Sequence, residues 1–238
     1  MKTFAAINVG SYEQSLKIYT ITKNNGIREV DWIRNRLDLG STFATGKLSH
    51  EVMDELCAVL RNFVSIMEGY RVDDYRACAT SAIRETKNTA IVLDQIMQRT
   101  GVKLDVLSNS EQRFLDYKSI ASRGGFEKII EKGTLVLDIG GGSIQMSLFD
   151  KDKLSATQNM RLGVLRLQEK MSRLNVRPSE NGPLLEELLE AQLSVFRKMY
   201  LKDRVIENII VVDDYISALI LGKLGKVAGS GYLDRDSM

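Results

Sequence analysis

Apolar strand patterns open the chain and return in its second half. Residues 3–10 and 134–138 are apolar runs typical of buried strands. Each run is followed by two further strand-like segments, at 16–22 and 28–34 in the first half and at 144–150 and 154–160 in the second. Each run also ends in a turn of small residues, Gly10-Ser11 in one case and Gly140-Gly141-Gly142-Ser143 in the other. The pattern predicts an internally duplicated α/β protein in which both halves begin with three strands.

Helical spacing of apolar residues predicts several helices after each group of strands. Ser49 is placed to cap a helix to about Gly69, and Asn88 to cap another through Gln98. The further helices are expected from residue 108 or 110 to 122, and over 162–171, 183–202 and 214–224. Short strands are expected over 74–79, 102–107 and 207–212. Because Gly124-Gly125 interrupts the pattern, we expect one lobe over residues 1–123 and a second over 124–238.

The amino-acid composition argues against several classes of protein and site. The chain has 238 residues and a net charge of +2, which gives no reason to expect a nucleic-acid partner. Two cysteines are too few for a disulfide framework, and a single histidine, His50, argues against histidine-based nucleophilic catalysis. No apolar run approaches 18 residues and the N-terminus lacks the core of a signal peptide. We therefore expect no membrane association and a cytoplasmic location.

The strongest chemical signal is the glycine run after the strand at 134–138. Asp138 ends this strand, and three glycines and Ser143 come next after Ile139. Without a Cβ, glycine lets backbone N–H groups approach an anion closely, and an aspartate at a strand end can hold a cation. The run therefore favours a phosphate site. The alternative is a tight hairpin, although such a turn seldom needs three glycines between Asp and Ser.

Three weaker signals carry two interpretations each. Arg84 follows Thr80-Ser81 in a donor-rich corner, where it would bind phosphate or pair with a surface carboxylate. Glu111 stands near a helix start, where it would activate a water or serve as an N-terminal helix glutamate. Arg161 and Arg166 would contact phosphate or form a solvated basic face.

Taken together, these segments resemble the exopolyphosphatase and pppGpp phosphohydrolase family. That family carries, in order, runs like AxIDxGSNS, ATSAxREAxN, SGxEEARLxY, DxGGGSxE and LGxxRL. This chain has AAINVGSYEQS at 5–15, ATSAIRETKN at 79–88, LSNSEQRFLDY at 107–117, DIGGGSIQ at 138–145 and LGVLRL at 162–167. The order and spacing agree over about residues 1–170.

The resemblance implies a fold and a reaction. The fold would be α/β, with two ribonuclease-H-like lobes of the actin/hexokinase type built on a duplicated βββαβα unit, and the active site in the cleft. The reaction would be Mg²⁺-dependent hydrolysis of a terminal phosphoanhydride of polyphosphate or guanosine pentaphosphate. Glu111 would be the catalytic base, and Asp138 with Asn8 would hold the metal. The phosphate ligands would be Ser11, Arg84, Gly141, Gly142 and Ser143. A homodimer is a further expectation from the family.

Departures from the family pattern leave alternatives open. Asn8 stands where the family has Asp, Gln145 where it has Glu, and only Glu111 remains of an acidic pair. Residues 211–216 replace a Gly-Gly-Thr turn, and the second lobe is expected to lack the family's closing strand and helix. Amides bring no charge to a metal, so the chain is either a hydrolase or a non-catalytic binder of the same ligands. A sugar kinase or filament-forming ATPase is a third hypothesis, which Asp213-Asp214 disfavours in the region of an adenosine site.

Overall fold

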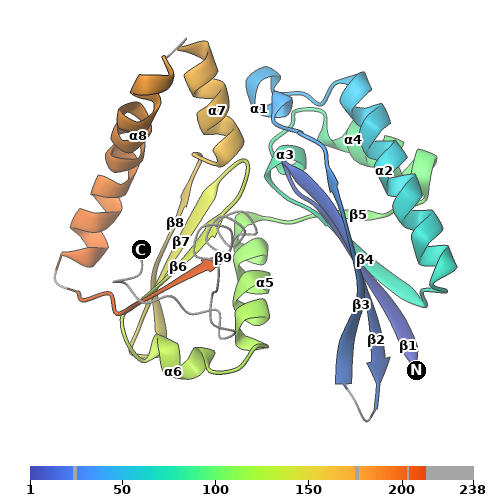
Figure 1. Ribbon diagram of the computed structural model, residues 1–238, viewed down its shortest axis with the longest axis horizontal. Helices are drawn as coiled ribbons and strands as arrows, with labels where there is room; N and C mark the ends of the chain where they lie inside the picture. Colours follow the sequence, from blue (N-terminus) through green and yellow to red (C-terminus); the bar gives the residue numbers. More distant parts are fainter. Residues whose placement is uncertain (24–25, 175–176, 203, 213–238) are drawn as a thin grey trace.

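The computed structural model describes residues 1–23, 26–174, 177–202 and 204–212. Two sheets stand side by side with helices around them (Figure 1). The first has the order β3-β2-β1-β4-β5 and the second the order β8-β7-β6-β9. The segments predicted at 214–224, the substituted turn after Val212, Asp213-Asp214 and the closing part of the second lobe lie outside the described residues.

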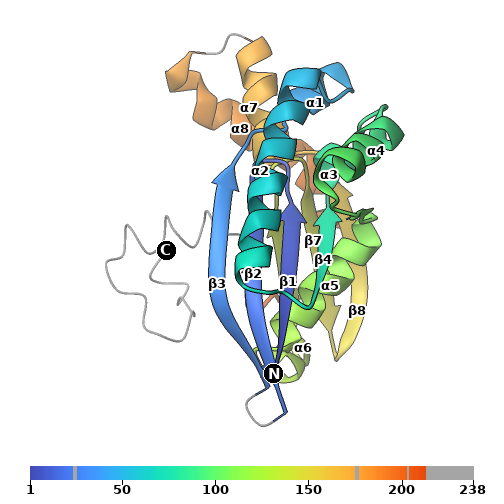
Figure 2. The same cartoon turned by 90° about the vertical axis from the view of Figure 1, so that its right-hand side faces the viewer.

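The first sheet comes from the N-terminal half of the chain. Its strands are β1 (Lys2–Val9), β2 (Glu13–Thr22), β3 (Gly26–Arg36), β4 (Asp74–Ala79) and β5 (Leu104–Val106). The helices of this half are α1 (Ser41–Thr45), α2 (His50–Gly69), α3 (Ser81–Arg84) and α4 (Thr89–Thr100). Helix α2 lies across the outer face of the sheet (Figures 1 and 2), where Leu56, Leu60 and Phe63 are fully buried. Ser49 caps α2 as expected, since its side chain accepts from the N–H of Val52.

The second sheet repeats this plan. Its strands are β6 (Thr134–Ile139), β7 (Ile144–Asp150), β8 (Lys153–Met160) and β9 (Asn208–Val212). The helices are α5 (Asn109–Ala121), α6 (Phe126–Ile130), α7 (Val164–Arg173) and α8 (Asn181–Phe196), with a 3₁₀ turn, η1 (Pro178–Glu180), and a π-helical turn, η2 (Arg197–Leu201). In both sheets the first three strands pair antiparallel and the next strand pairs parallel to the first. The duplication predicted from the sequence is therefore confirmed.

Helix α5 packs against the second sheet although it comes after the last strand of the first. Tyr117 and Ile120 lie on a cluster formed by Phe126, Val136 and Phe149. The Tyr117 and Phe149 rings meet edge to face with centroids 5.1 Å apart. The predicted boundary between the two lobes at residues 123 and 124 stays a prediction. It depends on α5, which precedes this boundary in the sequence but packs against the second sheet. None of the described helices is long and apolar enough to cross a membrane.

Candidate active site

The same turn comes after the first strand of each sheet. After β1 the N–H of Gly10 donates to the carbonyl of Glu13 at 2.9 Å, and after β6 the N–H of Gly140 donates to the carbonyl of Ser143 at 2.9 Å. Two residues before these glycines stand Asn8 and Asp138, which are therefore equivalent positions in the two sheets. Strand alternation turns Asn8 away from the core that holds Ile7, so its side chain is exposed toward the cleft.

The two turns face each other at close range. Parallel pairing of β1 and β4 brings their carboxyl ends together, so the hydroxyls of Ser11 and Ser81 form a hydrogen bond of 2.8 Å. A Cβ placed on Gly141 would lie 3.1 Å from the Cβ of Ser11 in the opposite turn. A Cβ on Gly142 would lie 2.4 Å from both the Phe43 ring and the Ser81 hydroxyl oxygen. Glycine is thus needed here for the contact between the two halves of the molecule.

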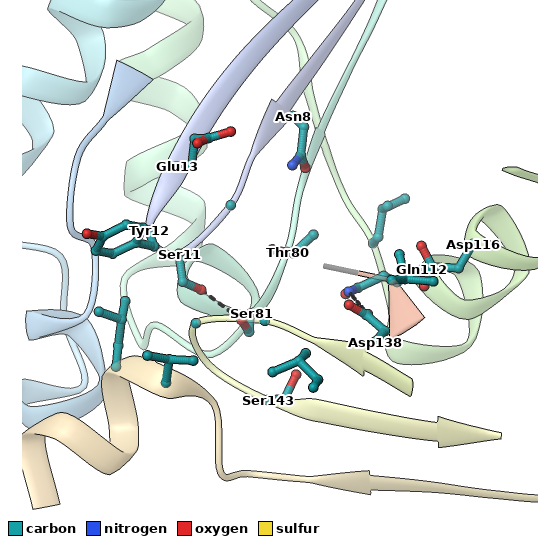
Figure 3. Close-up of a pocket in the computed structure, with 18 of the residues that line it drawn as sticks. Asn8, Ser11, Tyr12, Glu13, Thr80, Ser81, Gln112, Asp116, Asp138 and Ser143 are labelled. Atoms are coloured by element: carbon teal, nitrogen blue, oxygen red, sulfur yellow. Dashed lines mark hydrogen bonds between the residues drawn. The ribbon is translucent and has the colours of Figure 1, made fainter. Parts of the chain in front are cut away.

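A cavity of about 590 Å³ opens beside the two turns (Figure 3). Its wall combines both turns, the ends of β1, β4 and β6, and one face of α5. The lining side chains that bear hydroxyl, amide or carboxyl groups are Asn8, Ser11, Tyr12, Glu13, Ser15, Thr80, Ser81, Gln112, Asp116, Asp138, Ser143 and Gln168. Of the predicted site residues, Asn8, Ser11, Asp138, Gly141 and Ser143 lie together in this wall.

Asp138 is held by amide donors. Its Oδ2 accepts from Gln112 Nε2 at 2.7 Å and from Gln145 Nε2 at 3.1 Å. Gln145 stands opposite Asp138 in the β6–β7 pair and is 1% exposed. Asp116, one helical turn after Gln112, lines the same cavity as Asp138. Burial, followed by the charge of Asp138, raises the pKa of Asp116 to about 7.

Glu111 does not line this cavity. It is exposed at the third position of α5, where its carboxylate accepts from the Ser108 N–H at 2.8 Å and its own N–H donates to the Ser108 hydroxyl at 3.2 Å. These two bonds form a capping box, and the Ser108 backbone bond lowers the pKa of Glu111. The structural role weighed for Glu111 is therefore present, and its catalytic role stays a prediction.

The three predicted arginines are not among the residues that line the cavity, and each makes protein contacts. Arg84 donates to the carbonyl of Leu107 at 2.6 Å, and burial lowers the pKa of Arg84. Its buried Nη2 finds no hydrogen-bond partner among the described residues. Arg161 and Arg166 both pair with Glu85, and Arg166 also donates to the carbonyl of Gly142 at 2.7 Å. Glu85 thus joins the first half of the chain to the glycine turn of the second.

Acidic groups outnumber basic groups in the cavity wall. Among the described lining residues none is Lys or Arg, whereas three carboxylates are present. Glu13 is neutralised by Arg34, whose Nη2 lies 2.7 Å from a Glu13 carboxylate oxygen. Asp116 and Asp138 remain, with the amides around them. Carboxylate and amide oxygens are donors that a hard divalent cation takes, but the described residues contain no cluster of three or more His, Cys, Asp or Glu that could hold a metal ion. The buried Oδ2 of Asp116 has no hydrogen-bond partner among the described residues.

Sequence reasoning missed Gln112 and Asp116. Glu111 was predicted as the catalytic base from its place near a helix start and from its match to the remaining acid of the family's pair. The residues of α5 that line the cavity are Gln112, Leu115 and Asp116, whereas Glu111 is exposed at the start of the helix and does not line it. Residues four apart share a face, and this spacing links Gln112 to Asp116. The signal that could have identified Gln112 and Asp116 was their spacing of four residues in the helix that begins after Ser108.

The fold and the cavity define the class of protein: a two-lobed α/β protein of the actin-like type with glycine turns at the cleft. The chain matches the model of the Ppx/GppA phosphatase family over residues 23–210, and it belongs to that family. This confirms the resemblance seen in the sequence.

The relatives include two kinds of curated protein and a solved structure. Exopolyphosphatase 1 of Mycobacterium leprae is 27% identical over 155 residues, which are 65% of this chain and 44% of the relative. Guanosine-5'-triphosphate,3'-diphosphate pyrophosphatase of Photobacterium profundum is 25% identical over 181 residues, 75% of this chain and 35% of the relative. The Aquifex aeolicus family member has the same fold, with a TM-score of 0.70 at 22% identity, over 99% of this chain and 72% of that one. The chain spans less than half the length of the curated relatives it matches.

Proposed function

We propose that the chain is a phosphohydrolase that releases the terminal phosphate of polyphosphate or guanosine pentaphosphate in the cavity between the two sheets. The observation that carries this proposal is the pair of equivalent glycine turns, which pack against each other and line one cavity beside them. Family membership supports hydrolysis of phosphate compounds. The names of the Mycobacterium leprae and Photobacterium profundum relatives support the two substrates.

The proposed roles derive from the cavity wall. Ser11, Ser143 and Thr80 offer hydroxyls to phosphate oxygens, and the glycine turns let the backbone approach them. Asp138 and Asn8, at equivalent positions of the two sheets, would hold Mg²⁺ with carboxylate and amide oxygens. When bound, Mg²⁺ neutralises charge on the phosphate chain and polarises the phosphoryl group. Because the cavity wall has no described Lys or Arg, a polyanion depends on such a cation for entry.

A second candidate is a non-catalytic binder of the same ligands. It is favoured by the position of Glu111 outside the cavity wall and by the amide of Gln112 at the corresponding place inside it. A general base must come within hydrogen-bond reach of the attacking water, and an amide cannot take its proton.

Phosphate release and ligand binding, measured on the same protein, separate the two candidates. Release from long-chain polyphosphate and from pppGpp would be followed with and without Mg²⁺, beside thermal stabilisation by each ligand. Mg²⁺-dependent release supports the hydrolase. Stabilisation without release supports the binder, and absence of both in folded protein contradicts the phosphate site itself.

Two variants, Glu111→Gln and its control Ser108→Ala, test whether Glu111 is the catalytic base. Ser108→Ala removes one half of the capping box, whereas Glu111→Gln removes the carboxylate and keeps an oxygen that can accept from the Ser108 N–H. Loss of release in Glu111→Gln alone would assign the base to Glu111. Equal retention of release in both variants would limit Glu111 to the helix cap.

A further inference from the structure

Three backbone N–H groups in the glycine turn after β6 are free to bind a ligand. Those of Gly141, Gly142 and Ser143 donate to no backbone carbonyl of the described residues, whereas the N–H of Gly140 donates to the Ser143 carbonyl. Successive free N–H groups in a turn form a concave surface that suits an anion. Gly141 and Ser143 also line the cavity, and Figure 3 shows Ser143 in its wall. The turn can therefore serve a phosphate only if these amides are held in a fixed direction.

Arg166 of α7 holds this turn, although Arg166 itself does not line the cavity. Its Nε donates to the Gly142 carbonyl at 2.7 Å, and its Nη2 pairs with the carboxylate of Glu85. Its guanidinium lies over the Phe43 ring, with Cζ 4.0 Å from the ring centroid. Only 19% of the Arg166 side chain and 14% of the Glu85 side chain are exposed, so salt and water screen the ion pair little. Contacts in three directions therefore fix the guanidinium.

The bond from Arg166 sets the direction of the next amide in the turn. The Gly142 C=O and the Ser143 N–H belong to one peptide group, and in a trans peptide these two groups point in opposite directions. The Ser143 N–H is therefore directed away from Arg166. A charged donor on the carbonyl also polarises the peptide group, which makes its N–H a stronger hydrogen-bond donor.

We propose that Arg166 is a positioning residue: it orients and polarises the Gly142–Ser143 peptide so that the Ser143 N–H binds an oxygen of the phosphate chain. The inference rests on the proposed function, because it takes a phosphate chain as the ligand of the cavity. Glu85 supports this role, since its carboxylate aligns the guanidinium. Glu85 follows α3 in the first half of the chain, so the phosphate-binding turn of the second half depends on a side chain of the first.

Arg161 offers an internal comparison. It pairs with the same carboxylate of Glu85, but 68% of its side chain is exposed and its hydrogen bonds among the described residues go to Glu85 and not to the turn. Lysine keeps the charge at either position, but one ammonium group cannot reproduce the planar fork that binds Gly142 and Glu85 together. The same substitution at Arg161 and Arg166 therefore separates a weaker pair with Glu85 from the loss of the bond to the turn.

The test is the affinity for inorganic tripolyphosphate with Mg²⁺, measured by calorimetry on the wild type, Arg166→Lys and Arg161→Lys. We expect the affinity to fall by about tenfold or more in Arg166→Lys, because a hydrogen bond to a charged ligand is weakened or lost. In Arg161→Lys it should stay within about twofold of the wild type. The amide resonance of Ser143 should shift on ligand binding in the wild type and Arg161→Lys, but not in Arg166→Lys. A purely structural role would lower the urea midpoint of Arg166→Lys and leave the affinity of the folded protein and this shift unchanged.

Equal affinity of folded Arg166→Lys and the wild type would overturn the proposal, as would a Ser143 amide that does not shift when the wild type binds tripolyphosphate. Urea midpoints establish that each variant is folded, and Glu85→Gln replaces Arg166→Lys if the latter unfolds, with a loss of affinity again expected. Absence of tripolyphosphate binding by the folded wild type would contradict the phosphate site and the positioning role with it. Binding that is lost in Arg166→Lys, in a wild type that releases no phosphate from polyphosphate, would uphold the positioning role and contradict only the hydrolase.

Discussion

Gly142 is the position where the structure makes its sharpest steric prediction. A Cβ there would lie 2.4 Å from the Phe43 ring and from the Ser81 hydroxyl oxygen, and 2.9 Å from the Ser81 Cβ. Phe43 has little room to move, because the Arg166 guanidinium stacks on its ring 4.0 Å from the centroid. Overpacking by one methyl group in such surroundings costs about 1–3 kcal/mol. We therefore expect Gly142→Ala to lower the free energy of unfolding by that amount.

Gly140→Ala is the matched control in the same turn. Its added Cβ would meet only the Ser143 carbonyl oxygen, at an ordinary 3.4 Å, and Gly140 is not among the described glycines with positive φ. The methyl group also reduces the entropy of the unfolded chain, so the net change should stay within about 0.5 kcal/mol. Urea unfolding followed by circular dichroism measures both variants. Equal stability of Gly142→Ala and Gly140→Ala would refute the close contact between the two halves.

Three further predictions concern the cap, the carboxyl pair and the ion pairs. Ser108→Ala should lower the free energy of unfolding by about 1 kcal/mol in urea, with a smaller loss for Glu111→Ala and ligand-induced thermal stabilisation unchanged in both. Since the pKa of Asp116 is raised to about 7 in the folded state, that state keeps a proton which the unfolded chain releases near pH 4. Urea midpoints at successive pH values should therefore show a stability contribution that is lost as the pH rises from 4 to 7, and Asp116→Asn should abolish this part of the slope. Glu85→Gln should destabilise the protein by about 1–3 kcal/mol in the same urea assay, because it leaves the half-buried Arg166 without its carboxylate.

Most of the fold could be predicted from local patterns. The strands of each half carry apolar runs or alternation, and the glycine turns mark where β1 and β6 end. The duplicated strand order arises because both halves repeat this pattern. The short helices α1, α3 and α6 were not predicted, since segments of four or five residues are too short to show helical periodicity.

Only the site residues that lie at the ends of strands could be predicted from the sequence. Ser11, Asp138 and Ser143 line one cavity because the turns after β1 and β6 meet there, and their roles toward phosphate and metal stay predictions. The phase of α5 was not anticipated, so Gln112 and Asp116 were missed. Arginine partners depend on side chains distant in the sequence, such as Glu85 for Arg166, which no local pattern reveals.

The most direct test of phosphate chemistry in the cavity is Mg²⁺-dependent phosphate release by the wild type, Asp138→Asn and the surface control Asp94→Asn. Long-chain polyphosphate and pppGpp would both serve as substrates. The predicted result is release by the wild type and Asp94→Asn, with a rate lower by about a hundredfold or more in Asp138→Asn. Release that is equal in Asp138→Asn and the wild type would contradict the assignment of the cavity as the active site.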